Sequence, residues 1–554
     1  RTMDIQSELA GSFKGELDVT DSVREFYSHD ASLFELKPEV VGFPKDSKDL
    51  QAVVQFVNKH KKKFPELNIT PRSRGTDMSG AAIGDSILLD VSKHMNKLLA
   101  VSKAEATVQP GMMYRDFEAE TLKKGALLPS YPASRELASV GGMVSNNSGG
   151  EKSLEYGKTD KFVTELKVIL SDGNEYTLKP LTRTQLIKKM SQKAFEGKLY
   201  KETFELLEEH YDEIQAAAPH VTKDSTGYHL WNVWNRETGI FDLTKLFVGA
   251  QGTLGLISEA TVNLVPHKPH SGLLVLFLRD IDDLGELIPA VLKHKPATFE
   301  SFDDQTLLLS IKFMPSFLKM LGLKKFIHLL LSLIPDGLQL LHGIPKLVLM
   351  VEFNGETEDE VRKKVHALHQ ELQKKRARYE INGFEETPTE HASEKFWVMR
   401  RNSFQLLRSK VKDKHTAPFI DDFVVPPQHL SVFLPKLRKI IKKYRLFATI
   451  AGHMGDGNFH VIPLMKIEDP KERAKLEPAM KEVNNLVIKY GGSVSGEHND
   501  GMVRGPWLEA MYGKKVLGYM KEIKKLYDPD NIFNPHKKTD ASWDFSFSHI
   551  REKF

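Results

Sequence analysis

Two short segments in the C-terminal half of the chain contain side chains that could bind a metal ion. The first, 452–460 (GHMGDGNFH), holds His453 and His460 around a glycine-rich bend, which can turn both imidazoles toward one point. The second, 495–501 (SGEHNDG), supplies the carboxylate of Glu497 beside another histidine. Two histidines and one carboxylate leave a coordination position open to a substrate, whereas a single histidine in such a turn more often only hydrogen-bonds the backbone.

Three glycine-rich segments in the N-terminal half could hold a phosphate-bearing ligand. They are 71–80 (PRSRGTDMSG), 139–150 (SVGGMVSNNSGG) and 248–259 (VGAQGTLGLISE). Loops of this composition offer unobstructed N–H groups and hydroxyls to phosphate oxygens, and arginines add positive charge. A solvated turn uses the same residue types, so one loop decides little, but three such loops in one domain are hard to explain as connectors.

The order of these three segments resembles the FAD-binding domain of the vanillyl-alcohol-oxidase type, over about 38–266. The resemblance implies that 72–77 wraps the pyrophosphate, 139–147 runs along the flavin and ribitol, and 252–257 holds the adenine side. The residues that it assigns to the cofactor are Arg72, Ser73, Arg74, Gly75, Thr76, Asp77, Ser79, Pro132, Ser139, Gly141, Gly142, Ser145, Asn146, Asn147, Gly252, Gly255 and Ile257. Some relatives attach the flavin through a histidine in the first loop, where this chain has Thr76 and Asp77, so we expect non-covalent FAD.

The two metal-type segments resemble those of D-lactate, glycolate and D-2-hydroxyglutarate dehydrogenases, and the likeness extends over roughly 18–535. It implies that His453, His460 and Glu497 bind a divalent metal, zinc in the first place and manganese in the second, and that His498 is the general base. The metal would lower the pKa of the substrate hydroxyl, and the base would take its proton while the Cα hydrogen leaves as hydride to FAD. The resemblance therefore predicts oxidation of a lactate- or glycolate-like D-2-hydroxy acid to the 2-oxo acid.

Substrate selection is expected to depend on an arginine and on the side chains around it. Arg400 stands where relatives carry the arginine that binds the substrate carboxylate. The alternatives are that Arg401 binds this carboxylate instead, or that Arg400 is only an exposed surface charge. Relatives specific for 2-hydroxyglutarate carry threonine, lysine and asparagine where this chain has Phe404, Ile420 and Ile462. These differences argue against a second carboxylate on the substrate and favour a smaller or more apolar side chain.

Two other functions use the same flavin fold. An alkylglycerone-phosphate-synthase-like alkyl transferase carries a run of histidines where this chain has Gly496, Glu497 and His498, and an electron-relay subunit needs neither metal nor base. Asn499 stands where a glycine often follows the GEH triplet, which leaves the local backbone conformation open.

Composition limits the partners. The chain has 78 Lys and Arg against 74 Asp and Glu, a net charge of +4, so no nucleic-acid partner is expected. Because the chain has no cysteine, it cannot hold its own iron–sulfur cluster. Electrons must therefore pass to a separate acceptor, which is a quinone, a cytochrome, oxygen or an iron–sulfur subunit. The oligomeric state stays open.

One apolar segment bears on localisation. The stretch 317–334 (FLKMLGLKKFIHLLLSLI) is interrupted by Lys319, Lys324 and Lys325 and falls short of the roughly 20 apolar residues of a membrane span. It is either a helix of the cap domain or a basic amphipathic helix on a membrane surface. Since the first residues lack a signal pattern, we expect a cytoplasmic protein, peripheral at the inner face of the membrane if this helix is interfacial.

The hydrophobic pattern predicts an α+β protein that would position these residues. Short apolar runs alternating with turns predict strands at 40–44, 67–71, 86–91, 106–109, 164–170, 271–278, 346–353 and 446–450. The expected divisions are an N-terminal arm (1–34), a two-subdomain FAD-binding domain (35–268), an antiparallel-sheet substrate or cap domain (269–480) and a C-terminal helical segment with the GEH motif (481–554).

Overall fold

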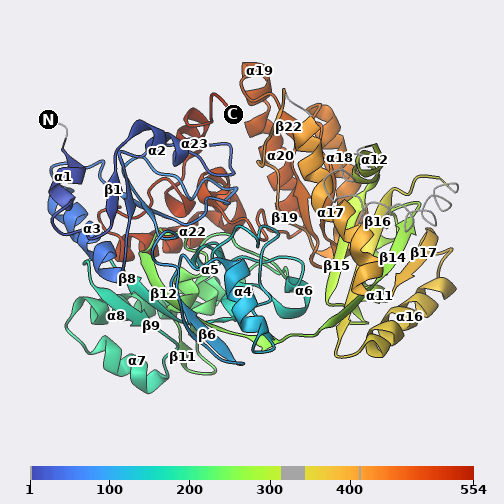
Figure 1. Ribbon diagram of the computed structural model, residues 1–554, viewed down its shortest axis with the longest axis horizontal. Coiled ribbons are helices and arrows are strands. Elements are labelled where there is room, and N and C mark those ends of the chain that lie inside the picture. The colour runs from blue at the N-terminus through green and yellow to red at the C-terminus, as the bar shows by residue number, and fades with distance from the viewer. Residues whose placement is uncertain (1–2, 313–342, 411–412) are drawn as a thin grey trace.

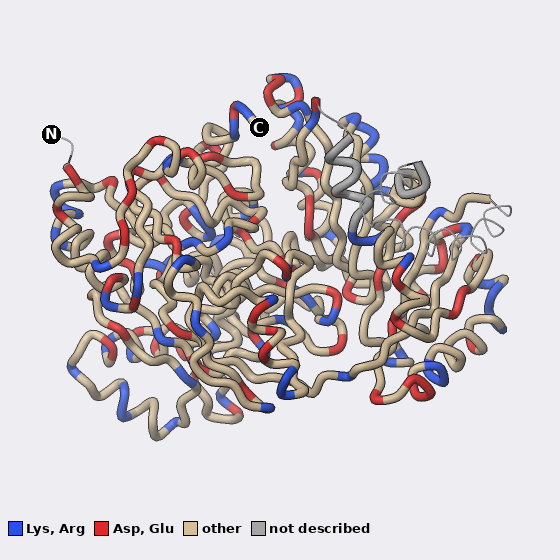
Figure 2. Tube along the Cα trace, in the orientation of Figure 1, with Lys and Arg blue, Asp and Glu red and all other residues tan. Residues whose placement is uncertain are grey.

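The computed structural model describes residues 3–312, 343–410 and 413–554, and three sheets with their helices make up most of it (Figure 1). The segment 317–334, expected to be a cap-domain or interfacial helix, lies outside the described residues, as does the side chain of Phe404. Along the described trace, basic and acidic residues are interspersed rather than separated by sign (Figure 2). No helix in the described part is long and apolar enough to cross a membrane.

The first sheet is small and mostly parallel. Its strand order is β1 (Glu16–Asp18), β2 (Val40–Phe43), β4 (Ile87–Asp90) and β3 (Ile69–Arg72), with only β1 antiparallel to its neighbour. Helix α3 (Ser47–His60) begins at Asp46, whose side chain accepts hydrogen bonds from Lys48 N and Asp49 N, and its apolar side is buried. The first glycine-rich loop therefore leaves the carboxyl end of β3.

The second sheet is antiparallel, and the other two glycine-rich segments adjoin its central strand. Its order is β5 (Leu98–Val101), β6 (Glu105–Val108), β12 (Leu256–Asn263), β8 (Val163–Ile169) and β9 (Glu175–Leu178). The second segment forms α5 (Val140–Asn146), which contacts β12, and the third segment leads directly into β12. Residues of all three glycine-rich segments line one common cavity.

The third sheet, here called the cap sheet, has seven antiparallel strands. The order is β17 (Ile381–Thr387), β14 (His270–Leu278), β16 (Leu347–Gly355), β15 (Thr298–Asp303), β20 (Ile450–His453), β21 (Asn458–Val461) and β19 (Phe423–Val424). Its helices include α16 (Glu358–Lys374), α17 (Glu390–Lys410), α18 (Leu430–Lys443) and α20 (Leu476–Lys489). The cap sheet lies to the right of the other two sheets in Figure 1.

One predicted strand is displaced. The apolar run 446–450 yields strand only at Ile450, where β20 begins. Helix α18 ends just before it, and Arg445 adopts a left-handed conformation (φ 52°) that reverses the chain. Residues 446–449 are therefore used in the connection from helix to strand, although Leu446 is still buried in the core.

The C-terminal segment returns to the N-terminal half. Helix α22 (Leu508–Tyr527) packs against α8 (Phe195–Glu209), and Phe533 forms a parallel bridge with Ile69 of the first sheet. The predicted α+β class, with an antiparallel cap sheet beside a two-sheet N-terminal half, is confirmed.

Candidate active site

A β-hairpin brings the two motif histidines together. His453 ends β20 and His460 lies in β21, and because Ala451 pairs with His460, both imidazoles project from the same face. Their ring centroids are 5.4 Å apart at an interplanar angle of 89°. The turn needs Gly457, which has φ 67° and whose Cβ would collide with the carbonyl of Val425.

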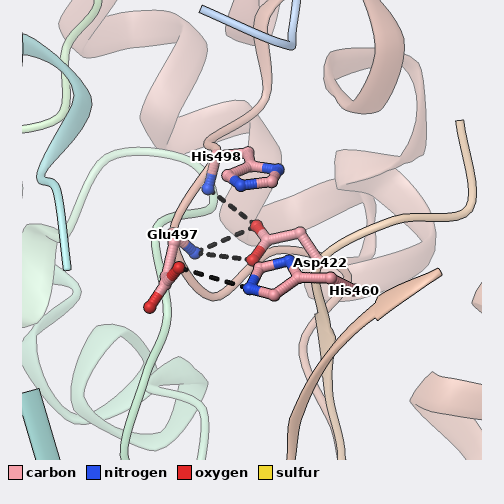
Figure 3. A group of neighbouring side chains, drawn as sticks. All are labelled: Asp422, His460, Glu497 and His498. Atoms are coloured by element: carbon pink, nitrogen blue, oxygen red, sulfur yellow. Dashed lines mark hydrogen bonds and ion pairs between the residues drawn. The ribbon is translucent and has the colours of Figure 1, made fainter. Parts of the chain in front are cut away.

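The carboxylate of Glu497 faces both histidines. Glu497 Oε1 lies 3.1 Å from His453 Nε2. Glu497 Oε2 lies 3.5 Å from His460 Nε2, a contact drawn in Figure 3. The loop is anchored by Asp422, whose carboxylate accepts hydrogen bonds from Glu497 N at 2.9 Å and from His498 N at 2.7 Å. Glu497 thus contacts both predicted histidine ligands, and the side chains here whose donor atoms all lie within 4.8 Å of one another are Asp422, His460, Glu497 and His498.

Asp421 orients two of the histidines at once. Its Oδ1 lies 3.2 Å from His460 Nδ1, and its Oδ2 lies 2.8 Å from His498 Nδ1. Burial alone would raise the pKa of Asp421, but the imidazoles of His498 and His460 outweigh it and hold the pKa below its ordinary range. The ionised carboxylate fixes both rings by their Nδ1 atoms, which leaves Nε2 of each ring for a ligand or a substrate.

Glu300 plays the same part for His453. One oxygen of Glu300 contacts His453 Nδ1, and the other lies 3.1 Å from both Nε and Nη2 of Arg400. Burial would raise the pKa of Glu300, but His453 and Arg400 lower it to about 2. The predicted substrate arginine is thereby tied to the same cluster as the predicted metal ligands.

The donor set fits a divalent cation. A carboxylate on the far nitrogen of each ligating histidine is the usual support of a metal site, and Glu300 and Asp421 supply it for His453 and His460. Burial would lower the pKa of His460, but hydrogen bonds to Asp421 and Glu497 raise it to about 10. The two carboxylates therefore stabilise a positive charge placed between them. Asp422 and His498 also offer donor atoms close to those of His460 and Glu497, but the oxygens of Asp422 already accept the amide hydrogen bonds of the GEH loop.

Lys223 reaches the cluster from the other side. Its Nζ lies 2.6 Å from Glu497 Oε1 and 3.4 Å from Asp456 Oδ2, and its side chain is 1% exposed. The pKa of Lys223 is raised because Glu497 and Asp456 outweigh its burial. This lysine comes from a loop that precedes the third glycine-rich segment, so it joins the two halves of the molecule.

One cavity of about 750 Å³ connects this cluster with all three glycine-rich loops. Of the predicted cofactor residues, it is lined by Arg72, Ser73, Gly75, Thr76, Asp77, Pro132, Ser139, Gly141, Gly142, Ser145, Asn146, Gly252, Gly255 and Ile257. At its other end it is lined by Arg400, His453, His460, Glu497 and His498. The predicted cofactor and metal residues thus share a single space.

Three predicted cofactor residues do not line this cavity. Arg74 is exposed on its loop, Ser79 donates a hydrogen bond to Asp77, and Asn147 ends α5 in a left-handed conformation (φ 51°). Arg72 lines the cavity, but its Nη1 donates to the carbonyl of His29 at 2.9 Å. Their contribution to a ligand would be indirect, through the shape of the loops.

The cavity walls fit an elongated cofactor with phosphates. Ser139 Oγ donates to Ser73 Oγ at 2.7 Å, and a Cβ on Gly142 would lie 3.1 Å from both hydroxyl oxygens. Glycines elsewhere in the loops also serve close packing of the chain itself, since a Cβ on Gly141 would collide with the backbone of Pro110. Main-chain atoms and hydroxyls, rather than large side chains, therefore form this wall.

Sequence profiles of two domain families match the chain. Residues 38–179 match the FAD binding domain, and residues 268–538 match the C-terminal domain of FAD linked oxidases. The chain belongs to the FAD-linked oxidase family. This assignment agrees with a cavity that joins glycine-rich loops of the first matched region to the histidine cluster of the second.

Relatives of this FAD-linked oxidase include enzymes named for 2-hydroxy acids. D-2-hydroxyglutarate dehydrogenase of Pseudomonas putida is 28% identical over 528 residues, which are 95% of this chain and 50% of the relative, so the chain spans about half the length of that protein. Glycolate oxidase subunit GlcD of Bacillus subtilis is 27% identical over 548 residues, 97% of each chain.

Solved structures with the same fold include 4-ethylphenol oxidase from Gulosibacter chungangensis, with a TM-score of 0.65, 15% identity and coverage of 97% of this chain and 96% of that one. An alkyldihydroxyacetonephosphate synthase has a TM-score of 0.64 and 16% identity, with coverage of 97% and 86%. At such identities the likeness shows the fold alone, and the predicted flavoprotein fold is confirmed.

In this FAD-linked oxidase, apolar side chains stand beside the histidine cluster. Trp397, Ala451 and Ile462 line the cavity together with Arg400. Arg401 also lines it, but Glu151 holds its Nη2 at 2.7 and 2.9 Å, and its guanidinium lies 4.5 Å from the ring of Trp397. The two arginines that the sequence left as alternatives are therefore each engaged by a different carboxylate.

Proposed function

We propose that this FAD-linked oxidase oxidises a D-2-hydroxy acid to the corresponding 2-oxo acid. When bound, FAD supplies the two-electron acceptor, and a divalent metal, zinc in the first place and manganese in the second, supplies a Lewis acid. The observation that carries the proposal is the single cavity that exposes the three cofactor loops at one end and the His453, His460 and Glu497 cluster at the other. The names of the relatives support the substrate class.

His498 is the proposed general base. Asp421 holds its Nδ1, so that Nε2 is the nitrogen left to accept the hydroxyl proton of the substrate. The same carboxylate stabilises the imidazolium that results, because the neighbouring imidazoles of His498 and His460 outweigh its burial and keep Asp421 ionised. The substrate loses this proton to His498 and its Cα hydrogen, with two electrons, to the cofactor, which balances the oxidation.

Arg400 is proposed to bind the substrate carboxylate. Glu300 fixes its guanidinium through Nε and Nη2 beside the metal cluster, so that a carboxylate bound there would lie next to His453. Around it, Trp397, Ala451 and Ile462 offer apolar surface to the rest of the substrate. A small or apolar substituent at C2 therefore fits this wall better than a second carboxylate does.

FAD is proposed to bind without a covalent link, held by the loops 72–79, 139–147 and 252–257. Thr76 and Asp77 occupy the place of the histidine that links the flavin in some relatives. After acid precipitation the yellow colour should remain in the supernatant. Colour that stays with the precipitated chain would contradict this part of the proposal.

The electron acceptor is proposed to be a separate quinone, cytochrome or iron–sulfur subunit, because the chain has no cysteine for a cluster of its own. Peripheral contact with the cytoplasmic face of a membrane stays a prediction that depends on the segment 317–334.

Anaerobic flavin reduction tests the proposed reaction. FAD-loaded protein is mixed with glycolate, the D and L forms of lactate and 2-hydroxybutyrate, and D-2-hydroxyglutarate. The D forms of the short acids should bleach the flavin, the L forms should not, and D-2-hydroxyglutarate should react more slowly than D-lactate. If no 2-hydroxy acid bleaches the flavin, the proposed reaction is wrong, and if D-2-hydroxyglutarate reacts fastest, the account of the apolar wall is wrong.

A further inference from the structure

We propose a second divalent-metal site, for zinc or a similar borderline cation, on the surface of the cap sheet and apart from the cavity described above. Its ligands are His366 and His369 of α16 and Glu386 of β17. None of the three lines the cavity, so this site goes beyond the proposed function. Imidazole nitrogens and a carboxylate oxygen are the donors that zinc accepts in proteins that lack thiolates.

The three donor atoms already lie close to one another. The Nδ1 atoms of His366 and His369 lie 3.1 and 2.5 Å from the same oxygen of Glu386, and one donor atom from each residue lies within 4.8 Å of the others. Donors on a tetrahedral zinc, at about 2.0–2.1 Å from the ion, are roughly 3.3 Å apart. Small side-chain rotations would therefore admit the ion, without movement of helix or strand.

Local sequence explains why the ligands meet. Residues three apart on a helix face the same side, so His366 and His369 both point from α16 toward β17. The ring of His369 packs against Phe384, with centroids 4.6 Å apart, and Phe384 and Glu386 lie on one face of the strand because they are two residues apart. The helix and the strand thus present the donors to each other.

A polar neighbour holds the far nitrogen of one ligand, as in established metal sites. The side-chain amide of Gln370 lies 2.9 Å from His366 Nε2. When His366 Nδ1 binds a metal, Nε2 must carry the proton, and the Gln370 amide would turn its oxygen to accept it. Exposure of the His366 side chain (55%) leaves room for water as the remaining ligand.

The site would clip an edge strand to a helix. β17 is an edge strand of the cap sheet and pairs only with β14 in that sheet. One side of β17 therefore has no strand partner among the described residues. A metal shared by α16 and Glu386 would tie this edge to the helix that also packs on β14 and β16. We infer a stabilising role for the cap domain rather than a catalytic one.

Zinc stoichiometry tests the proposal. FAD-loaded protein is stripped with a chelator, equilibrated with zinc ions alone at micromolar free concentration and analysed for bound zinc. Wild-type protein should bind two equivalents, and His369→Ala and Glu386→Gln should each bind one. The matched control is His391→Ala, since His391 is an exposed histidine on α17 outside the cluster and its removal should leave two. His369→Ala should also keep wild-type FAD content and turnover.

The result separates this proposal from the active-site proposal. If wild-type protein and His369→Ala bind the same number of zinc ions, the surface site does not exist. If wild-type protein binds one equivalent and His369→Ala binds none, the surface site is supported. The same result would contradict the proposed metal site at His453 and His460. A zinc-induced rise in Tm that disappears in His369→Ala but persists in His391→Ala is the second readout, and an equal rise in both would overturn the stabilising role.

Discussion

The two ends of the cavity are built in different ways. The cofactor end is formed by main chain, glycines and hydroxyls of three loops, whereas the metal end is formed by buried charged side chains that hold one another. At the metal end Asp421 serves two histidines and Glu300 serves a histidine and an arginine. Shape therefore governs the first end and charge pairing governs the second, where removal of one partner leaves another buried and unpaired.

The largest effect is expected from removing the base at the metal end. His498→Ala should retain both FAD and metal, because the proposed metal ligands are His453, His460 and Glu497. Turnover should fall about 10²–10⁴-fold, equivalent to about 3–5 kcal/mol of barrier. Elemental analysis, the flavin spectrum and steady-state rates check this. Near wild-type turnover in His498→Ala would place the base elsewhere.

Asp421→Asn should reveal how far the charged groups act as a unit. The amide keeps the size of the side chain but cannot hold both Nδ1–H groups with a charge, so metal affinity or turnover should fall about 10–100-fold. In a double mutant with His498→Ala, the two losses in turnover should be less than additive, because Asp421 acts partly through that histidine. Fully additive losses would show that the two side chains act independently.

A substitution at the cofactor end should act by shape alone. Gly142→Ala places a methyl 3.1 Å from two hydroxyl oxygens at the cavity wall, so the Kd for FAD should rise about tenfold, or about 1.4 kcal/mol, with unchanged metal content. The matched control is Gly518→Ala, because a Cβ at Gly518 meets nothing within 4 Å. Equal FAD affinity in both variants would remove Gly142 from the cofactor wall.

The smallest expected effect is a change in the pH dependence of stability caused by Asp30, a buried carboxyl that lies outside the histidine cluster. Burial raises the pKa of Asp30 to about 7, with a further contribution from Asp77, in contrast to the lowered pKa of Asp421. A raised carboxyl pKa stabilises the fold fully below about pH 4, and this contribution is lost as pH rises through 7. Between pH 6 and 8 the wild type should therefore lose about 1 kcal/mol of stability that Asp30→Asn does not lose. Denaturant unfolding at both pH values measures it, and equal losses in the two proteins would contradict the assignment.

Residues of the metal end that lie in short local motifs could be predicted from the sequence. That His453, His460, Glu497 and His498 lie close together could be predicted, because each lies in a short motif whose spacing or resemblance carries the information, and their roles stay a proposal. Asn499 adopts φ 68°, the left-handed conformation that glycine and asparagine tolerate, which resolves the question left by its departure from the usual glycine.

The supporting charges could not be predicted from local pattern. Glu300 meets His453 across 153 positions and Lys223 meets Glu497 across 274, so only the packing of separate strands and loops brings them together. Asp421 and Asp422 follow Ile420 directly, and this acidic pair in a short apolar context was the one local signal available. The strand expected at 446–450 failed for a related reason, since a helix end used its first residues.

Metal dependence of flavin reduction tests the central claim most directly. FAD-loaded protein is stripped with a chelator, mixed anaerobically with the D-2-hydroxy acid that bleaches it fastest, and then supplied with zinc, with His453→Ala in parallel. The account predicts that stripped protein keeps its flavin absorbance, stays oxidised, and is bleached once zinc is restored, whereas His453→Ala keeps FAD but is never bleached. Bleaching of the stripped protein at an undiminished rate would contradict it.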